Sequence, residues 1–167
     1  MSAELSDNQN RTRVVRWQDP ARMLAAGQDL SGLAYIRQIR DGLLPAPPIA
    51  ALMGMQFDEV EEGRVVMSVM PAEYHYNPLG TVHGGLAATI CDSAMACAVH
   101  TMLPAGKAYT TLELHINYIR PITQETGQLR CIGSVIHVGR RMATAEARLI
   151  DAGDKLYCHS TTTCIVL

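Results

Sequence analysis

The chain has 167 residues and a formal net charge of −2, with 48% hydrophobic and 18% charged residues. This length suits one domain with its own hydrophobic core, and the composition excludes a disordered chain. No uncharged apolar run reaches the roughly 18 residues that a membrane span needs. The near balance of charge and the scarcity of aromatic residues argue against nucleic acid as a partner. We therefore expect a soluble globular protein that binds neither nucleic acid nor membranes.

The N-terminal segment and the cysteines indicate a cytoplasmic location. The first sixteen residues are polar and lack the apolar region of a secretion signal. The cysteines are odd in number, lie in apolar or alternating segments and form no C-x-x-C pair, which favours reduced, buried thiols. The five are Cys91, Cys97, Cys131, Cys158 and Cys164.

Residues 1–48 have the pattern of helices rather than strands. Asp19 followed by Pro20 is typical of a helix cap and first turn, and the apolar residues of 31–40 fall near one helical face. A glycine and three prolines then end the helical pattern. We expect an N-terminal helical extension over residues 1–48, hinged onto a single domain formed by residues 49–167.

From Met55 onward the apolar residues recur with a period of two, and Gly63 suits a turn between two strands. Residues 81–103 are then apolar or small almost throughout and contain no proline. Because that run is too long for one strand, we expect a helix over residues 84–103. A helix that is apolar nearly all round belongs in the interior of a protein.

Four alternating stretches follow the helix, joined in part by hairpin-sized turns. Strict alternation in the first stretch would place Leu112 and Leu114 on one face and Thr111 and Glu113 on the other. One helix wrapped by a curved antiparallel sheet accounts for this order of elements, so we predict an α+β fold. The stretches are residues 111–118, 129–138, 142–151 and 156–166.

Two features of the predicted helix point to chemistry. Asp92 is its one carboxylate, and a buried unpaired charge costs several kcal/mol in practice, so this side chain needs a partner or a purpose. Gly84 and Gly85 stand where the helix begins, with bare N–H groups and the positive end of the helix dipole, an arrangement that can hold an oxyanion. The structural alternatives are an Asp that reaches solvent and an ordinary flexible loop.

Taken together, a small set of positions resembles the signature of hotdog-fold acyl-CoA thioesterases of the phenylacetic-acid-degradation (PaaI-like) type. The resemblance covers residues 55–167, about the last two-thirds of the chain. It implies the hotdog fold and hydrolysis of an acyl-CoA thioester to a carboxylic acid and CoA. The positions are Asn77, Gly80, the run His83-Gly84-Gly85, and Asp92 eight residues after Gly84.

The resemblance also implies roles for individual residues. The glycine matching Gly84 donates its N–H to the thioester carbonyl, and the acid matching Asp92 acts as general base or nucleophile. Asn77 and His83 would support the site near the thioester. Thr111 falls where relatives carry a serine that helps to hold the attacking water, with Thr110 beside it as the alternative.

The turn Gly139-Arg140-Arg141 resembles the family's turn whose basic side chains approach the CoA phosphates. The planar fork of arginine suits phosphate, although an ordinary charged hairpin turn explains the same residues. We count Gly85 with Arg140 and Arg141 among the residues that bind the CoA part of the substrate. No cofactor is expected, because CoA belongs to the substrate, and no metal is expected, because Cys97 and His100 lack further ligands at a suitable spacing.

Helix geometry predicts a site shared between two chains. Eight residues separate Gly84 from Asp92, which corresponds to about 12 Å along a helix axis. An aspartate side chain cannot close that gap. If both residues serve one thioester, they come from two antiparallel helices across a two-fold axis. This agrees with the homodimer, and the dimer of dimers, that the resemblance implies.

Two alternatives remain at this stage. A hotdog enoyl-CoA hydratase or dehydratase would act on the same thioesters, but the D-x-x-x-x-H arrangement of some such relatives is absent around Asp92. A non-catalytic acyl-CoA binding module would gain nothing from a charge beside a neutral thioester. The acyl chain itself, small to medium or aromatic by resemblance, cannot be read from the residues.

Overall fold

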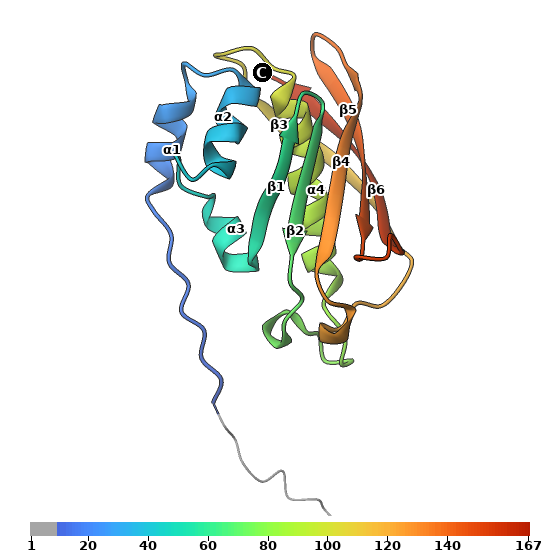
Figure 1. Ribbon diagram of the computed structural model, residues 1–167. Helices are drawn as coiled ribbons and strands as arrows, with labels where there is room; N and C mark the ends of the chain where they lie inside the picture. The colour runs from blue at the N-terminus through green and yellow to red at the C-terminus, as the bar shows by residue number, and fades with distance from the viewer. Residues whose placement is uncertain (1–9) are drawn as a thin grey trace, which may run out of the picture.

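A computed structural model describes residues 10–167 of the chain. Three short helices lie within residues 20–53, and six strands and one long helix follow them (Figure 1). The helices are α1 (Pro20–Gly27), α2 (Gly32–Arg40), α3 (Pro48–Met53) and α4 (Gly84–Thr101), with single 3-10 turns η1 (Glu73–His75) and η2 (Gln124–Thr126). The strands are β1 (Met55–Glu61), β2 (Arg64–Val69), β3 (Tyr109–Tyr118), β4 (Leu129–Val138), β5 (Met142–Ile150) and β6 (Leu156–Val166).

The six strands form one antiparallel sheet in the order β1-β2-β4-β5-β6-β3, so that β1 and β3 are the two edge strands. The hairpins β1–β2, β4–β5 and β5–β6 join strands that are neighbours in sequence. β3 follows α4 in sequence but pairs with β6, the last strand. The edge strand β3 is therefore held in the sheet by a strand that lies far from it in sequence.

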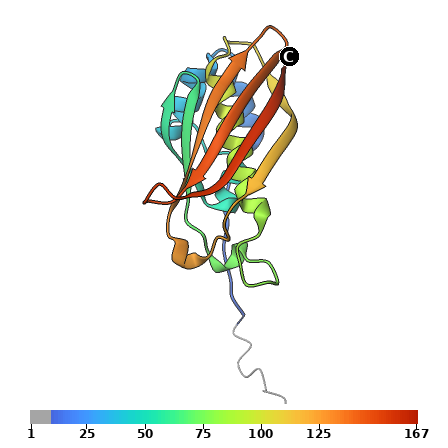
Figure 2. The same cartoon turned by 90° about the vertical axis from the view of Figure 1, so that its right-hand side faces the viewer.

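Helix α4 lies against one face of this sheet, which curves around it (Figures 1 and 2). The two approach closely at Gly133 of β4, where a Cβ atom would lie 2.5 Å from the backbone of Ala94. Only glycine fits there without displacing the helix. Ile90, Ala94 and Met95 of α4 are fully buried by this packing. The predicted arrangement of one long buried helix wrapped by a curved antiparallel sheet is confirmed.

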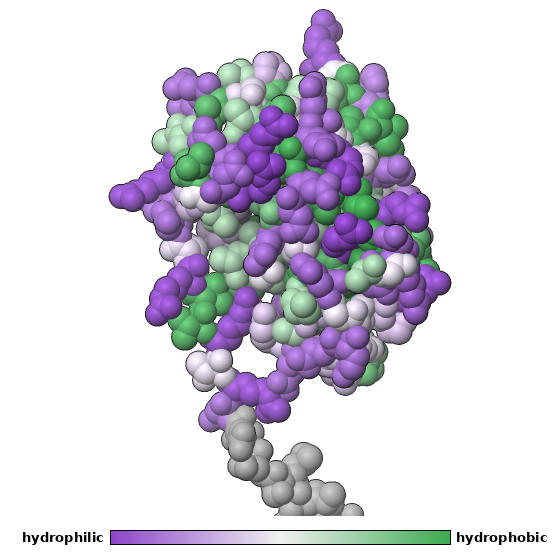
Figure 3. Space-filling model, viewed as in Figure 1, coloured by the Kyte–Doolittle hydropathy of each residue, from purple (hydrophilic) through white to green (hydrophobic). Residues whose placement is uncertain are grey.

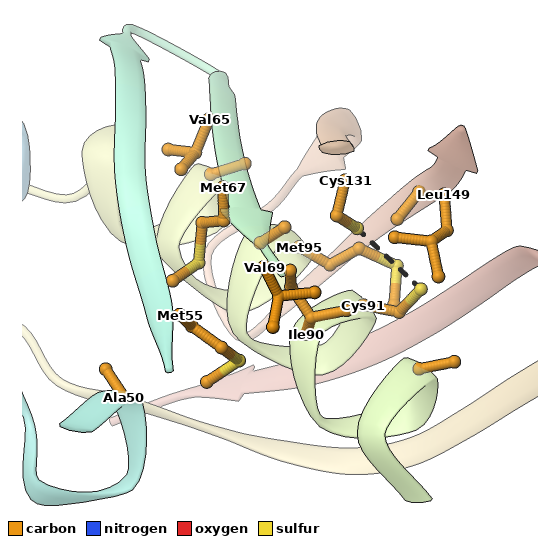
Figure 4. Close-up of a cluster of buried hydrophobic side chains, with 14 of the residues drawn as sticks. Ala50, Met55, Val65, Met67, Val69, Ile90, Cys91, Met95, Cys131 and Leu149 are labelled. Atoms are coloured by element: carbon orange, nitrogen blue, oxygen red, sulfur yellow. Dashed lines mark hydrogen bonds between the residues drawn. The ribbon is translucent and has the colours of Figure 1, made fainter. Parts of the chain in front are cut away.

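The core between α4 and the sheet is rich in sulfur (Figure 4). Met67 and Met95 fill space between branched aliphatic side chains, and methionine suits such irregular gaps because its chain is unbranched. Cys131 donates a weak hydrogen bond to Cys91, with 3.7 Å between the sulfur atoms. All five cysteines are free thiols, of which four are buried and Cys97 is partly exposed.

The N-terminal helices begin at the residues that the sequence indicates. The Asp19 side chain accepts a hydrogen bond from the N–H of Ala21, and the Ser31 side chain accepts one from Ala34, so both helices carry side-chain caps. α3 was not predicted: with Pro47 as its N-cap, a six-residue helix begins at Pro48, where the expected hinge over residues 43–48 ends. Proline is favourable in a first helical turn, which explains the difference.

One strand departs from the predicted alternation. Pairing of β3 with β6 runs from Thr111 opposite Cys164 directly to Glu113 opposite Thr163, which leaves Leu112 as the extra residue of a β-bulge. Residues of β3 before the bulge therefore point to the opposite face of the sheet from the one that strict alternation predicts for them. Leu112 is 55% exposed, whereas Leu114 packs against the core. The expectation that Leu112 and Leu114 share a face is therefore wrong, and Thr111 points to the helix side.

Among the residues that the structure describes, no helix is long and apolar enough to cross a membrane. The face in Figure 3 carries mainly hydrophilic side chains, with hydrophobic groups scattered among them. Exposed ion pairs of the described residues include Arg64 with Glu59, at 2.6 Å. Such exposed pairs contribute little stability and mark a solvated surface.

Candidate active site

Asp92 and Thr111 meet across the interface between α4 and β3. Thr111 donates a hydrogen bond from Oγ1 to Oδ1 of Asp92 over 2.9 Å, and both residues are half-buried. The contact exists because the bulge at Leu112 turns Thr111 toward the helix. Thr110, the alternative hydroxyl, is exposed. A carboxylate and a hydroxyl held together in this way can bind and orient one water molecule.

This pair lines a cavity of about 830 Å³. Burial and the nearby Asp92 carboxylate raise the pKa of the Cys97 thiol to about 12, so Cys97 is not a thiolate nucleophile at neutral pH. Burial also raises the pKa of Tyr109 and lowers the pKa of His100, which keeps both in their neutral forms. Among the titratable side chains around this cavity, Asp92 is the candidate base or nucleophile.

The start of α4 forms a second group of predicted residues. His83 is the N-cap of the helix, and its Nδ1 accepts a hydrogen bond from the N–H of Gly85 over 2.8 Å. The expectation of two bare N–H groups is therefore wrong for Gly85, whose N–H is already bonded. Gly84 is the first helical residue, and an N–H at that position has no partner within its helix. Gly84 thus remains the candidate oxyanion donor.

Asn77 shapes the loop that leads into this helix start. Its Oδ1 accepts hydrogen bonds from the N–H groups of Leu79 and Thr81, and its Nδ2 donates to Oγ1 of Thr81 over 3.0 Å. Gly80, at a φ of +79°, completes the turn. Asn77 therefore holds the approach to His83 and Gly84 by binding the loop itself.

Tyr118 stands over Gly84 and is a residue that the sequence did not single out. Its hydroxyl donates to the carbonyl of Gly84 over 3.3 Å, and a Cβ atom on Gly84 would lie 3.1 Å from its ring. These two residues line a separate cavity of about 310 Å³ together with Arg120. Tyr118 lies at the far end of β3 from Thr111, so no sequence spacing indicates its contact with the helix start.

Within one chain, Gly84 and Asp92 are not brought together. They lie about 12 Å apart along α4, at the calculated rise of a helix, and they line different cavities. β3 contacts both, with Thr111 beside Asp92 and Tyr118 beside Gly84. Each chain therefore holds two separate groups of candidate residues, one around Asp92 and one around Gly84.

Arg140 and Arg141 are exposed in the turn between β4 and β5. Strand pairing relates this turn to Thr111, because Ala143, two residues after Arg141, lies opposite Cys164, which lies opposite Thr111. Two strand spacings amount to about 10 Å. The basic turn is thus at the same end of the sheet as Thr111, and neither arginine lines the cavity beside Asp92.

The cavity beside Asp92 also receives side chains that sequence reasoning missed. The rings of Tyr35 and His100 lie 5.5 Å apart, and those of His100 and Tyr109 lie 5.1 Å apart. Tyr35 comes from α2, far from Asp92 in sequence. The amphipathic pattern of residues 31–40 could indicate a buried face but not what that face covers.

Comparison with known proteins gives a consistent result. The sequence profile of the thioesterase superfamily matches residues 79–158, which include the start of α4, Asp92 and Thr111. The chain is 24% identical over 114 residues to a 1,4-dihydroxy-2-naphthoyl-CoA hydrolase of Listeria monocytogenes, covering 68% of this chain and 91% of the relative. It is 30% identical over 111 residues to a "Putative esterase" of Halobacterium salinarum, covering 64% and 72%.

A solved structure supports the same grouping. The chain superimposes on a phenylacetic acid degradation-related protein of Ralstonia eutropha JMP134 with a TM-score of 0.71 and 27% identity. The match covers 78% of this chain and 98% of that protein. What this chain has beyond the match therefore amounts to about a fifth of its length.

Proposed function

Because the chain belongs to the thioesterase superfamily, as a PaaI-like thioester hydrolase with the hotdog fold, we propose that it hydrolyses acyl-CoA thioesters through Asp92. The observation that carries this proposal is the hydrogen bond between Thr111 and Asp92 at the cavity of about 830 Å³. The substrates are small-to-medium or aromatic acyl-CoAs, and the products are the free acid and CoA.

Asp92 acts as the general base in this proposal. Thr111 donates its own proton to Asp92, so its oxygen is left to accept a hydrogen bond from a water that also donates to the carboxylate. As the water oxygen attacks the thioester carbon, its proton passes to Asp92. The carbon–sulfur bond then breaks, and the proton goes to the departing CoA thiolate.

The N–H of Gly84 stabilises the oxyanion that forms on the carbonyl oxygen. The start of α4 adds the positive end of the helix dipole, and His83 and Asn77 hold the local backbone in place. Removing one such donor costs about 10²- to 10³-fold in turnover in other enzymes. Gly85 stays in a supporting position because its N–H is bonded to His83.

The active unit is a homodimer in which each site combines Asp92 and Thr111 of one chain with Gly84 of its partner. The separation of the two groups within one chain supports this arrangement. Arg140 and Arg141 then contact the CoA phosphates as the basic end of the site. The free thiols are compatible with the reducing cytosol, which we propose as the location of the protein and of its acyl-CoA substrate.

The test is a panel of acyl-CoA thioesters incubated with the purified chain, with release of free thiol followed by a chromogenic thiol reagent. The panel runs from acetyl-CoA to dodecanoyl-CoA and includes benzoyl-CoA, phenylacetyl-CoA and, for the hydratase alternative, an enoyl-CoA. Thiol release from at least one member, at a rate that saturates with substrate, supports the proposal. Absence of thiol release, with conversion of an enoyl-CoA that keeps its thioester, would identify the hydratase instead.

A further inference from the structure

Helix α2 packs against the C-terminal end of α4, and α1 is attached to α2. The sheet contacts α4 through its concave face, and α2 packs on both α4 and the edge strand β1 (Figure 1). The cavity beside Asp92 is lined by residues of α1, α2, β1, α4 and the start of β3. Within the proposed extension over residues 1–48, of which residues 1–9 lie outside the described part of the chain, α1 and α2 therefore border the space next to the carboxylate.

The attachment of α2 to α4 is close and specific. A Cβ atom on Gly32 would lie 1.7 Å from the carbonyl oxygen of His100, so only glycine permits this contact. The N–H of Gly32 donates to the carbonyl of Leu103 over 3.0 Å, and Arg37 donates to the carbonyl of Val60 over 3.2 Å. These contacts fix α2 as a wall rather than as a loosely attached segment.

α1 is held to α2 across the same cavity. The hydroxyl of Tyr35 donates to the carbonyl of Met23 over 3.2 Å, and the Tyr35 ring fills the space beside Gly27. Met23 is only 7% exposed and belongs to the hydrophobic core. Both helices thus contribute side chains to the inner surface of the cavity.

That inner surface combines an apolar part with polar side chains, among them Gln28, Lys107 and Asp92. Ile36, Ile39 and Phe57 line it together with Met23 and Tyr35. Among the described residues around this cavity, Asp92 is the one carboxylate and Lys107 the one lysine or arginine. A volume of about 830 Å³ is within the range of about 300–1,000 Å³ that small-molecule sites occupy.

We propose that α1 and α2 form the wall of the acyl pocket and that the substrate carries an apolar acyl group long enough to reach Met23. This rests on the proposed function, which puts the thioester carbon within about 3–3.5 Å of the attacking water at Asp92. CoA is hydrophilic and extends to solvent. The acyl group therefore binds in the cavity, where each buried methylene improves affinity about fourfold.

The first test widens the pocket. Met23→Ala removes side-chain volume from the wall, and Met55→Ala is its control because Met55 is 5% exposed in the same core without lining the cavity. Both variants lose comparable stability, since truncating a buried methionine is costly wherever it lies. The profile of kcat/KM against acyl length should move toward longer chains by about two methylenes in Met23→Ala alone.

The second test narrows the pocket and avoids any loss of core packing. Leu24 lines the cavity and is 71% exposed, whereas Leu43 is 74% exposed and lies outside it. Leu24→Trp should lower kcat/KM for the longest accepted acyl-CoA at least tenfold more than it lowers kcat/KM for acetyl-CoA, in line with rejection of a few methylenes. Leu43→Trp should keep the wild-type profile.

Binding of S-alkyl-CoA thioethers, which cannot be hydrolysed, separates this inference from the proposed function. Affinity that rises with alkyl length in the wild type and shifts in both cavity variants supports the acyl wall, even if no thioester is hydrolysed. If the chain hydrolyses acyl-CoA and neither Met23→Ala nor Leu24→Trp changes how kcat/KM depends on acyl length, the proposal that α1 and α2 line the acyl pocket is wrong. The thioesterase proposal would then remain intact. Absence of thioether binding at every length would also overturn the acyl wall.

Discussion

Thr111 and Asp92 are joined by a hydrogen bond of 2.9 Å between the edge strand β3 and the central helix α4. The bond needs both the extra residue at Leu112, which turns Thr111 inward, and the bare small-residue surface of α4, which lets the strand approach. It orients one carboxylate oxygen and leaves the other free. That asymmetry is what a general base requires, because one oxygen is positioned while the other takes the proton.

Replacing Asp92 should abolish hydrolysis and keep the fold. Asp92→Asn preserves the shape of the side chain but removes its basicity, so turnover should fall by about 10²- to 10⁴-fold or more. The measurement is kcat for the best acyl-CoA, together with the unfolding midpoint in urea. A variant that is folded and nearly as active as the wild type would refute the role of Asp92, and Asp92→Ala should be equally inactive.

The hydroxyl of Thr111 should matter through the position of Asp92 and the water. Thr111→Val keeps the branched shape and loses the hydrogen bond, and a bond to a charged group contributes about 1.5–3 kcal/mol, so kcat should fall by about 10- to 100-fold with little change in KM. Thr111→Ser should restore most of the rate. Thr110→Val, at the exposed neighbouring position, is the matched control. Equal losses in both valine variants would show that neither hydroxyl has the proposed role.

The basic turn should act on CoA and not on the acyl part. If Arg140 and Arg141 contact the phosphates, changing both to Ala should raise KM for acyl-CoA by about tenfold or more. The same double variant should hydrolyse an acyl-pantetheine thioester, which lacks the nucleotide, at the wild-type rate. An unchanged KM for the full CoA substrate would mean that the turn is an ordinary exposed hairpin.

Stability should decrease as the pH falls below about 6.5, partly through His75. Burial lowers the pKa of His75 from its ordinary 6.5, and the charge of Arg13 adds to the effect. Nδ1 of His75 accepts a hydrogen bond from the N–H of Ala72, and a proton on Nδ1 would break that bond and place two N–H groups face to face. The unfolded chain then binds protons more readily, and the stability present above pH 6.5 is lost as the pH falls through the folded pKa.

His75→Gln, which cannot take up a proton, should weaken this pH dependence. The measurement is the free energy of unfolding in urea at pH 7.5 and at pH 5.5. His100, whose pKa burial also lowers, should keep part of the slope in the variant. If His75→Gln shows the same decrease between the two pH values as the wild type, His75 is not one of its sources.

Much of this fold could be predicted because its elements have unambiguous periods. A run of some twenty small and apolar residues around Asp92 allows only a buried helix, and the turns at 139–141 and 151–154 separate clear alternating strands. The residues at the start of α4 could be identified because they are contiguous. His83, Gly84 and Asp92 are close in sequence, and all three belong to α4 or to its N-cap.

The remaining features depend on contacts between distant segments. The bulge at Leu112 is set by the register of β3 against β6 and leaves no mark in the alternation itself. The placement of Tyr35 beside His100 depends on how α2 docks, which the close contact at Gly32 determines. The pattern of a single sequence shows which face of a helix is apolar, but it does not show against which segment that face packs.

A mixture of two inactive variants tests the shared site most directly. Asp92→Ala lacks the base, and Gly84→Pro lacks the N–H at a first-turn position where proline is tolerated. The added Cβ at position 84 would lie 3.1 Å from the Tyr118 ring, so Gly84→Ala, which crowds the ring but keeps the N–H, is the control and should stay largely active.

The two variants are unfolded, mixed in equal amounts and refolded, and hydrolysis of the best acyl-CoA is compared with the wild type. Half of the dimers should then be mixed, and each mixed dimer holds one intact site that takes Asp92 from one chain and Gly84 from the other. Activity should return to about a quarter of the wild type by two-fold counting. A mixture as inactive as its parents, with folded heterodimers shown by mass spectrometry, would contradict the shared site.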